Sequence, residues 1–142
     1  MKNKLKLFLF LILPTSACYA QAEQTQVVNE IHPELKNIPI YPNSNGIMEG
    51  NPNWGDYQEE GHTVYSYIAK TINTSSVEKY YEKNMPDEWI SLGTGVGSAS
   101  DKEWTNMWYY KEDVFVDISI SQWTATSCLV VIDFYSDPNY KQ

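Results

Sequence analysis

Hydrophobic and polar residues alternate clearly in one segment near the C-terminus. From position 114 to 121, every even-numbered residue is a branched aliphatic one, and the odd-numbered residues are polar apart from Phe115. Because successive side chains of a strand point to opposite faces of a sheet, this alternation predicts a strand with one face in the core. The core face would carry Val114, Val116, Ile118 and Ile120, and the other face would carry Phe115, Asp117, Ser119 and Ser121.

Four further segments have the composition or the alternation that is typical of strands, namely residues 62–70, 89–92, 104–110 and 128–135. We expect residues 104–110 and 114–122 to form a hairpin across Lys111-Glu112-Asp113. The segment Ile38-Pro39-Ile40-Tyr41-Pro42 cannot be a central strand, because its two prolines lack the N–H donor. It is therefore expected to be an extended edge segment.

One helix is predicted between these strands. Ser75 and Glu78 have the spacing of a capping box, and Pro86 would end the helix. Its core-facing residues, at helical spacing, would be Val77, Tyr80, Tyr81 and Met85. The order of elements predicts an α+β fold, a twisted antiparallel sheet of about five to six strands with one helix packed on one face. The other face of the sheet would be partly open.

The first residues have the pattern of a secretion signal. Three lysines precede the apolar run Leu7 to Leu13, which is too short to span a membrane, and small residues follow. We expect a signal peptide at 1–20, a flexible leader at 21–34 and a single domain at 35–142. Cleavage before Gln21 is favoured, because Thr15 replaces the aliphatic residue of a lipobox. The alternative is lipidation of Cys18, and the protein would be periplasmic or secreted in either case.

The charge of the chain argues against two classes of partner. The formal net charge is −8 and there is no arginine; the signal holds three lysines and no acidic residue, so the remainder would carry −11. Nucleic acids and anionic lipids are bound through clustered Lys and Arg. We therefore expect a protein partner or a glycan, in the cell envelope or outside the cell, and no nucleic acid.

The chain resembles small exported bacterial α+β domains, many of them lipoproteins and most without an assigned function. The resemblance covers about residues 38–135. It depends on the Pro-Ile-Tyr-Pro segment, the strand Val64 to Ile68, the helix with Val77, Tyr80 and Tyr81, the following Trp89, and the closing hairpins. Glu88 stands where these domains usually have glycine. The resemblance implies the same fold and compartment, and it implies no catalytic residue.

Candidate catalytic and metal-binding motifs are few. His32 and His62 are the only histidines and have no partner at ligand spacing, and Cys128 lies in an apolar stretch that favours a buried thiol. Residues 93–98 contain three glycines, but no helix follows to bind phosphate, so we expect a flexible loop. Residues 51–60 are expected to form a solvated acidic loop. We expect no cofactor and no metal site.

Aromatic residues, 14% of the chain, are the remaining signal. An even-numbered hairpin loop would pair Trp108 with Asp117 or Phe115, and an odd-numbered loop would bury it in the core. The even loop is favoured, because the odd one would bury an asparagine and lacks the glycine that three-residue loops prefer. The open face would then present Trp104, Asn106, Trp108 and Tyr110 beside Asp117.

Three hypotheses of function follow from this face. The favoured one is a non-enzymatic binding domain that engages a protein partner, because exposed Trp and Tyr are enriched at binding hot spots. The alternative is a glycan-binding module. A hydrolase that works through Asp117 and Asp133 is the third, because these residues occupy matching positions on adjacent strands.

Overall fold

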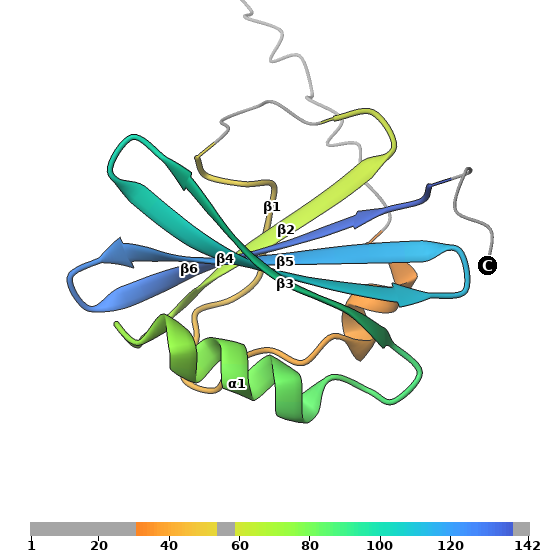
Figure 1. Cartoon of the computed structure of the whole chain (residues 1–142), viewed down its shortest axis with the longest axis horizontal. Coiled ribbons are helices and arrows are strands. Elements are labelled where there is room, and N and C mark those ends of the chain that lie inside the picture. The colour runs from red at the N-terminus through yellow and green to blue at the C-terminus, as the bar shows by residue number, and fades with distance from the viewer. Residues whose placement is uncertain (1–30, 54–58, 138–142) are drawn as a thin grey trace, which may run out of the picture. The chain divides into compact units, whose positions relative to one another are not determined.

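A six-stranded antiparallel sheet with a single α-helix across one face makes up the described part of the chain, residues 31–53 and 59–137 of a computed structural model (Figure 1). The strands are β1 (Met48–Glu49), β2 (His62–Ala69), β3 (Ile90–Ala99), β4 (Lys102–Lys111), β5 (Val114–Thr124) and β6 (Ser127–Tyr135). Their order in the sheet is β1-β2-β6-β5-β4-β3. Helix α1 (Thr74–Asn84) and a 3₁₀ helix, η1 (Pro33–Asn37), complete the elements. The predicted α+β fold is confirmed.

Some of the predictions lie outside the described residues. The signal peptide at 1–20, the cysteine proposed for lipidation, Cys18, and most of the leader at 21–34 are among them. At the end of the predicted leader, the His32 ring stacks on Phe134, with centroids 4.3 Å apart, so this residue packs against the sheet. Within the described residues, no helix is long and apolar enough to cross a membrane.

The main core lies between α1 and the sheet. Val77 and Tyr81 of the helix are fully buried against Val116, Ile118 and Ile120 of β5, as the alternation of β5 predicts. The Tyr81 hydroxyl bonds the Tyr67 hydroxyl of β2 at 2.8 Å, which satisfies two polar groups in an apolar layer. Burial raises the pKa of Tyr67 to about 12, so both phenols stay neutral.

Two local predictions on the helix side are corrected. The N-cap of α1 is Asn73, whose side chain accepts from the backbone N–H of Ser76 at 3.3 Å, so Ser75 is not the cap. Glu78 instead accepts a hydrogen bond from Thr105 of β4.

The extended segment that includes Ile40 is not an edge of the sheet, because it lies against the core and accepts a hydrogen bond from Tyr80 of α1. The edge strand on that side is β1.

The glycine-rich segment 93–98 is also corrected, because it is part of strand β3 and not a loop. Gly93, Gly95 and Gly97 pair with Trp108, Asn106 and Trp104 of β4. A Cβ atom on Gly95 would lie 2.6 Å from the Trp108 indole, and one on Gly97 would lie 2.4 Å from the Trp104 indole. Gly95 and Gly97 are therefore needed because the tryptophan rings occupy the space above them.

The hairpin between β4 and β5 has the predicted even-numbered register. Lys111 pairs with Val114 across the two-residue turn Glu112-Asp113, and Trp108 pairs with Asp117. Glu112 has φ 57°, a left-handed conformation that a two-residue turn requires of its first residue. This register places the even-numbered residues of β4 on the face opposite α1.

Candidate binding groove

A groove of about 510 Å³ lies on the face of the sheet opposite α1. Its floor comes from β4, β5 and β6, with side chains of Trp104, Asn106, Asp117, Ser119, Ser121, Val131 and Asp133. Its rim comes from two connecting segments, with Asn51 and Asn53 after β1, and Ala99 and Lys102 around the β3–β4 turn. Most of these side chains are amides, hydroxyls or carboxylates. A cavity of this size falls within the range that holds small ligands.

Asp117 and Asp133 lie directly opposite each other on β5 and β6. Side chains at opposed positions have Cβ atoms about 4.5–5.5 Å apart, so the two carboxylates are neighbours in the groove. The spatial pairing inferred from the phase of the two strands is confirmed. Burial raises the pKa of each carboxyl above its ordinary value, and the negative charge of Asp117 raises the pKa of Asp133 further.

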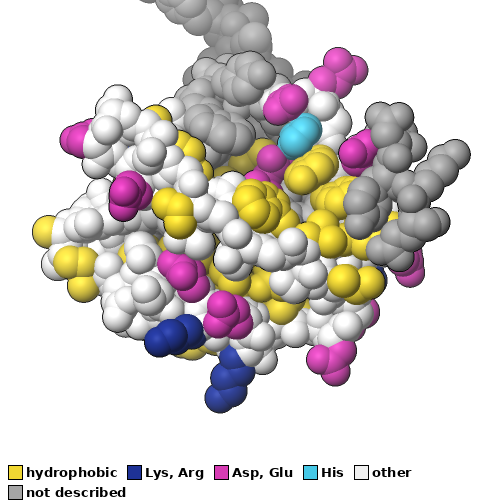
Figure 2. All heavy atoms as spheres, viewed as in Figure 1, with side chains coloured by type: hydrophobic (Ala, Val, Ile, Leu, Met, Phe, Trp, Pro, Cys, Tyr) yellow, Lys and Arg dark blue, Asp and Glu magenta, His cyan; other side chains and the backbone are white. Residues whose placement is uncertain are grey.

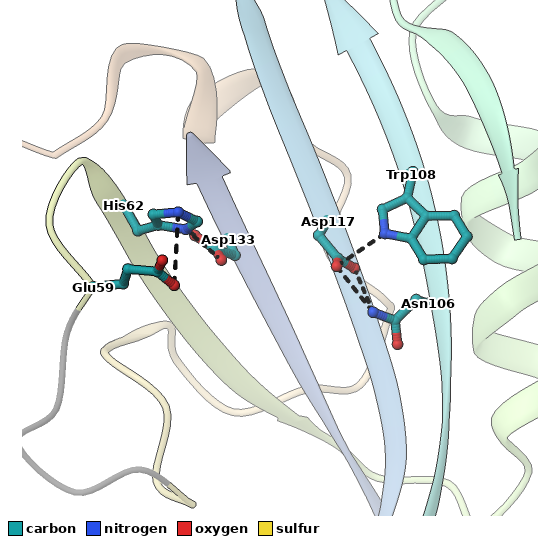
Figure 3. Close-up of polar contacts among 6 residues, drawn as sticks. All are labelled: Glu59, His62, Asn106, Trp108, Asp117 and Asp133. Atoms are coloured by element: carbon teal, nitrogen blue, oxygen red, sulfur yellow. Dashed lines mark hydrogen bonds and ion pairs between the residues drawn. The ribbon is translucent and has the colours of Figure 1, made fainter. Parts of the chain in front are cut away.

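The Asp117 carboxylate is held by uncharged donors from β4. The Trp108 Nε1–H donates to it at 3.0 Å, and the Asn106 amide donates to its two oxygens at 2.9 and 3.1 Å (Figure 3). These bonds, with one from Ser119, favour the ionised form and partly offset the effect of burial on the pKa. They also fix the orientation of Asn106 and of the Trp108 indole.

The Asp133 carboxylate is held from the other side by His62 of β2. His62 Nδ1 lies 2.9 and 3.0 Å from the two carboxylate oxygens, and its Nε2 lies 3.9 Å from the Glu59 carboxylate (Figure 3). The hydrogen bond and the positive charge of a protonated His62 both lower the pKa of Asp133 against the effect of burial. A polar row therefore crosses four strands, from His62 through the two aspartates to Trp108.

Among the described residues, Trp104 is the aromatic one that lines the groove. It is half-buried, with its indole above Gly97 of β3 and its position directly opposite Ser121 of β5. Because no side chain projects from Gly97, the ring can lie close to the backbone of β3. An aromatic surface therefore adjoins hydroxyl and amide groups on the floor of the groove.

The predicted platform of four exposed residues is only partly present. Trp104, Asn106 and Asp117 line the groove, and Trp108 lies on the same face with its N–H bound to Asp117. Tyr110, expected to be exposed, is only 8% exposed. It belongs to an aromatic row in which neighbouring ring centroids lie 4.9 to 5.4 Å apart, formed by His62, Tyr135, Phe115 and Tyr110.

Several residues of the groove were not predicted to lie there. Asn51 and Asn53 were expected in a solvated loop, yet Asn51 is 7% exposed and its side chain accepts from the Asn53 N–H at 2.9 Å. Lys102 brings a cation to the rim. The sequence contains no signal for these positions, because they depend on how connecting segments far apart in the chain meet over the sheet.

Comparisons with models of protein families, with curated proteins and with solved structures found no match. The chemistry of the groove must therefore be argued from its own residues. Among residues 31–53 and 59–137, no group of three or more His, Cys, Asp or Glu side chains could hold a metal ion. The buried thiol of Cys128 lies on the helix side and contacts the Thr71 carbonyl, away from the groove.

Proposed function

We propose that this protein is a non-enzymatic glycan-binding module of the cell envelope or the extracellular space. The observation that carries the proposal is the composition of the groove, in which Trp104 adjoins side-chain amides, hydroxyls and carboxylates. A sugar ring presents C–H groups to an aromatic surface and hydroxyls to polar side chains, and the hydroxyls both donate and accept. Asn, Ser and Asp together supply both functions.

The same observations favour a small ligand over a broad protein interface. An interface that uses aromatic hot spots needs exposed anchors, but Tyr110 is buried and the Trp108 N–H is occupied by Asp117. The groove is hollowed and combines apolar surface with polar side chains, and its volume suits one small ligand. The acidic character of the domain and the pattern of its first residues support a place outside the cytoplasm.

Titration with a panel of cell-wall and exopolysaccharide oligosaccharides, followed by tryptophan fluorescence and calorimetry, tests the proposal. We expect at least one oligosaccharide to bind, and Trp104→Ala to weaken that binding about fivefold or more, since stacking on an aromatic side chain contributes of order 1–3 kcal/mol. Trp123→Ala is the matched control, because Trp123 is 41% exposed and lies outside the groove. No binding across the panel, or equal losses in the two variants, would reject the proposal.

A hydrolase is a second candidate, favoured by one observation. The direct pairing of Asp117 with Asp133 places two carboxyl groups on adjacent strands in one groove, and a pair of carboxyl groups is what most glycosidases use. In that role one carboxyl would act as the acid and the other as the nucleophile. Release of new reducing ends from a bound oligosaccharide, abolished by Asp117→Asn or Asp133→Asn, would favour the hydrolase; binding without turnover would favour the module.

A further inference from the structure

The two aspartates of the groove have an unbalanced charge. Among the residues that the structure describes, three charged side chains line the groove, the carboxylates of Asp117 and Asp133 and the ammonium of Lys102. The printed partners of Asp117 within the described residues, Trp108, Asn106 and Ser119, are all uncharged. Like charges at directly opposed strand positions destabilise a sheet. The folded protein therefore keeps an unfavourable arrangement at this point.

Within residues 31–53 and 59–137, the other charged groups around the pair do not remove this imbalance. Asp133 has His62 as its partner, but His62 also faces the Glu59 carboxylate, so that side of the pair holds two acids for one imidazole. Lys111 is engaged elsewhere, with its ammonium 2.9 Å from Glu34 and 3.6 Å from Glu88. A positive group brought by a ligand would lie near two half-buried carboxylates on adjacent strands.

The geometry points to an amino sugar as the ligand, with its free primary amine bound between Asp117 and Asp133 and its ring over the floor of the groove. This inference rests on the proposed function, because it names the class of glycan. An ammonium group has three N–H donors and no acceptor, which suits a pair of carboxylates of which one, Asp117, accepts only from neutral donors among the described residues. Its charge also offsets the repulsion between them. An N-acetylated sugar would leave the pair without a cation.

Calorimetric titration at pH 6 with the β-1,4-linked tetramer of glucosamine and with its fully N-acetylated counterpart tests the inference. Hydrogen bonds to charged groups contribute about 1.5–3 kcal/mol, so we expect the amine form to bind at least about tenfold more tightly. Asp117→Asn and Asp133→Asn should each remove most of this preference. Their urea midpoints and circular dichroism spectra would show that both variants remain folded.

Asp113→Asn is the matched control for general charge attraction. Asp113 is exposed in the β4–β5 turn, outside the groove, and the substitution changes the net charge as much as Asp117→Asn does. An equal loss in Asp113→Asn and Asp117→Asn would overturn the inference, since the amine would then be attracted by the acidic surface as a whole. Equal binding of the two tetramers would overturn it but leave the glycan-binding function standing. Binding of neither tetramer would overturn it too, and failure of the whole oligosaccharide panel would overturn the function.

Discussion

At the scale of single residues, the groove depends on two glycines that do not line it. Gly95 and Gly97 lie in β3, beneath the indoles of Trp108 and Trp104. Glycine in a strand interior usually weakens the strand, since it has no side chain to pack and loses more conformational entropy on folding. Here that cost permits two large rings to fill the space above the strand. The Trp104 indole can take its position in the groove because Gly97, its partner on β3, has no side chain.

Gly97→Ala should therefore destabilise the protein. The new Cβ would lie 2.4 to 2.6 Å from three atoms of the Trp104 indole, so the ring must move, and overpacking of this kind costs typically about 1–3 kcal/mol. Urea denaturation followed by tryptophan emission would measure both the loss and the displaced ring. Gly46→Ala is the control, because no atom lies within 4 Å of a Cβ built there. A Gly97→Ala variant as stable as wild type would contradict the packing.

At the scale of elements, two residues near the N-terminus of α1 are candidates for its N-cap, Asn73 and Ser75. The Asn73 side chain accepts from the Ser76 N–H, whereas Ser75 lies within the first turn and is exposed. Asn73→Ala should cost about 1 kcal/mol, the usual effect of losing a cap, and Ser75→Ala should cost little. Thermal unfolding of the two variants checks this. A larger loss for Ser75→Ala would restore the capping box as the start of the helix.

The edge strand β3 has no charged residue and no proline, the usual means by which an edge strand avoids pairing with another chain. Its Val96 side chain is 76% exposed and Leu92 is 42% exposed; a β-bulge near Leu92 is the one irregularity within the strand. Val96→Lys should leave the free energy of unfolding within about 0.5 kcal/mol, as surface changes do. It should slow aggregation on heating, measured by light scattering. Unchanged aggregation would show that β3 is not the site of association.

The sequence predicted elements better than it predicted what lies around the groove. Period-two alternation located β5 and the phase of β6, and the shortage of glycine in residues 111–113 indicated the correct hairpin register. The same local reasoning failed for β3, because glycines at alternate positions resemble a loop until their partners on β4 are known. It also failed for Tyr110, which is buried by aromatic neighbours on other strands. Those contacts join residues that the chain order does not bring together.

At the scale of the whole molecule, acidic charge is the dominant feature. Acidic side chains are spread over the face seen in Figure 2, whereas lysine side chains are visible only at its lower edge. With eighteen acidic residues against ten lysines, repulsion opposes the compact state and keeps the protein soluble. The aspartate pair of the groove adds to this repulsion where burial also makes ionisation unfavourable. These two groups should therefore make a contribution to stability that depends on pH.

We expect acidification to favour the wild-type protein over Asp117→Asn. Burial raises the folded-state pKa of Asp117 and Asp133 above their ordinary value of 3.8, so the folded state binds more protons than the unfolded state between that value and the raised ones. Stability from these groups must then fall as the pH rises through this window, and increase as the pH falls through it. Asp117→Asn removes one of the two groups and relieves the other.

Free energies of unfolding from urea titrations between pH 4 and pH 7 would measure the difference between wild type and Asp117→Asn. That difference should shift in favour of wild type as the pH falls. Glu34 has a lowered pKa, caused mainly by its hydrogen bond from Asn37, and it acts in the opposite sense in both proteins, so it cancels. Asp113→Asn controls for net charge. Parallel curves for wild type and Asp117→Asn would mean that the two carboxylates are not coupled in the folded protein, and the basis for an amine between them would be lost.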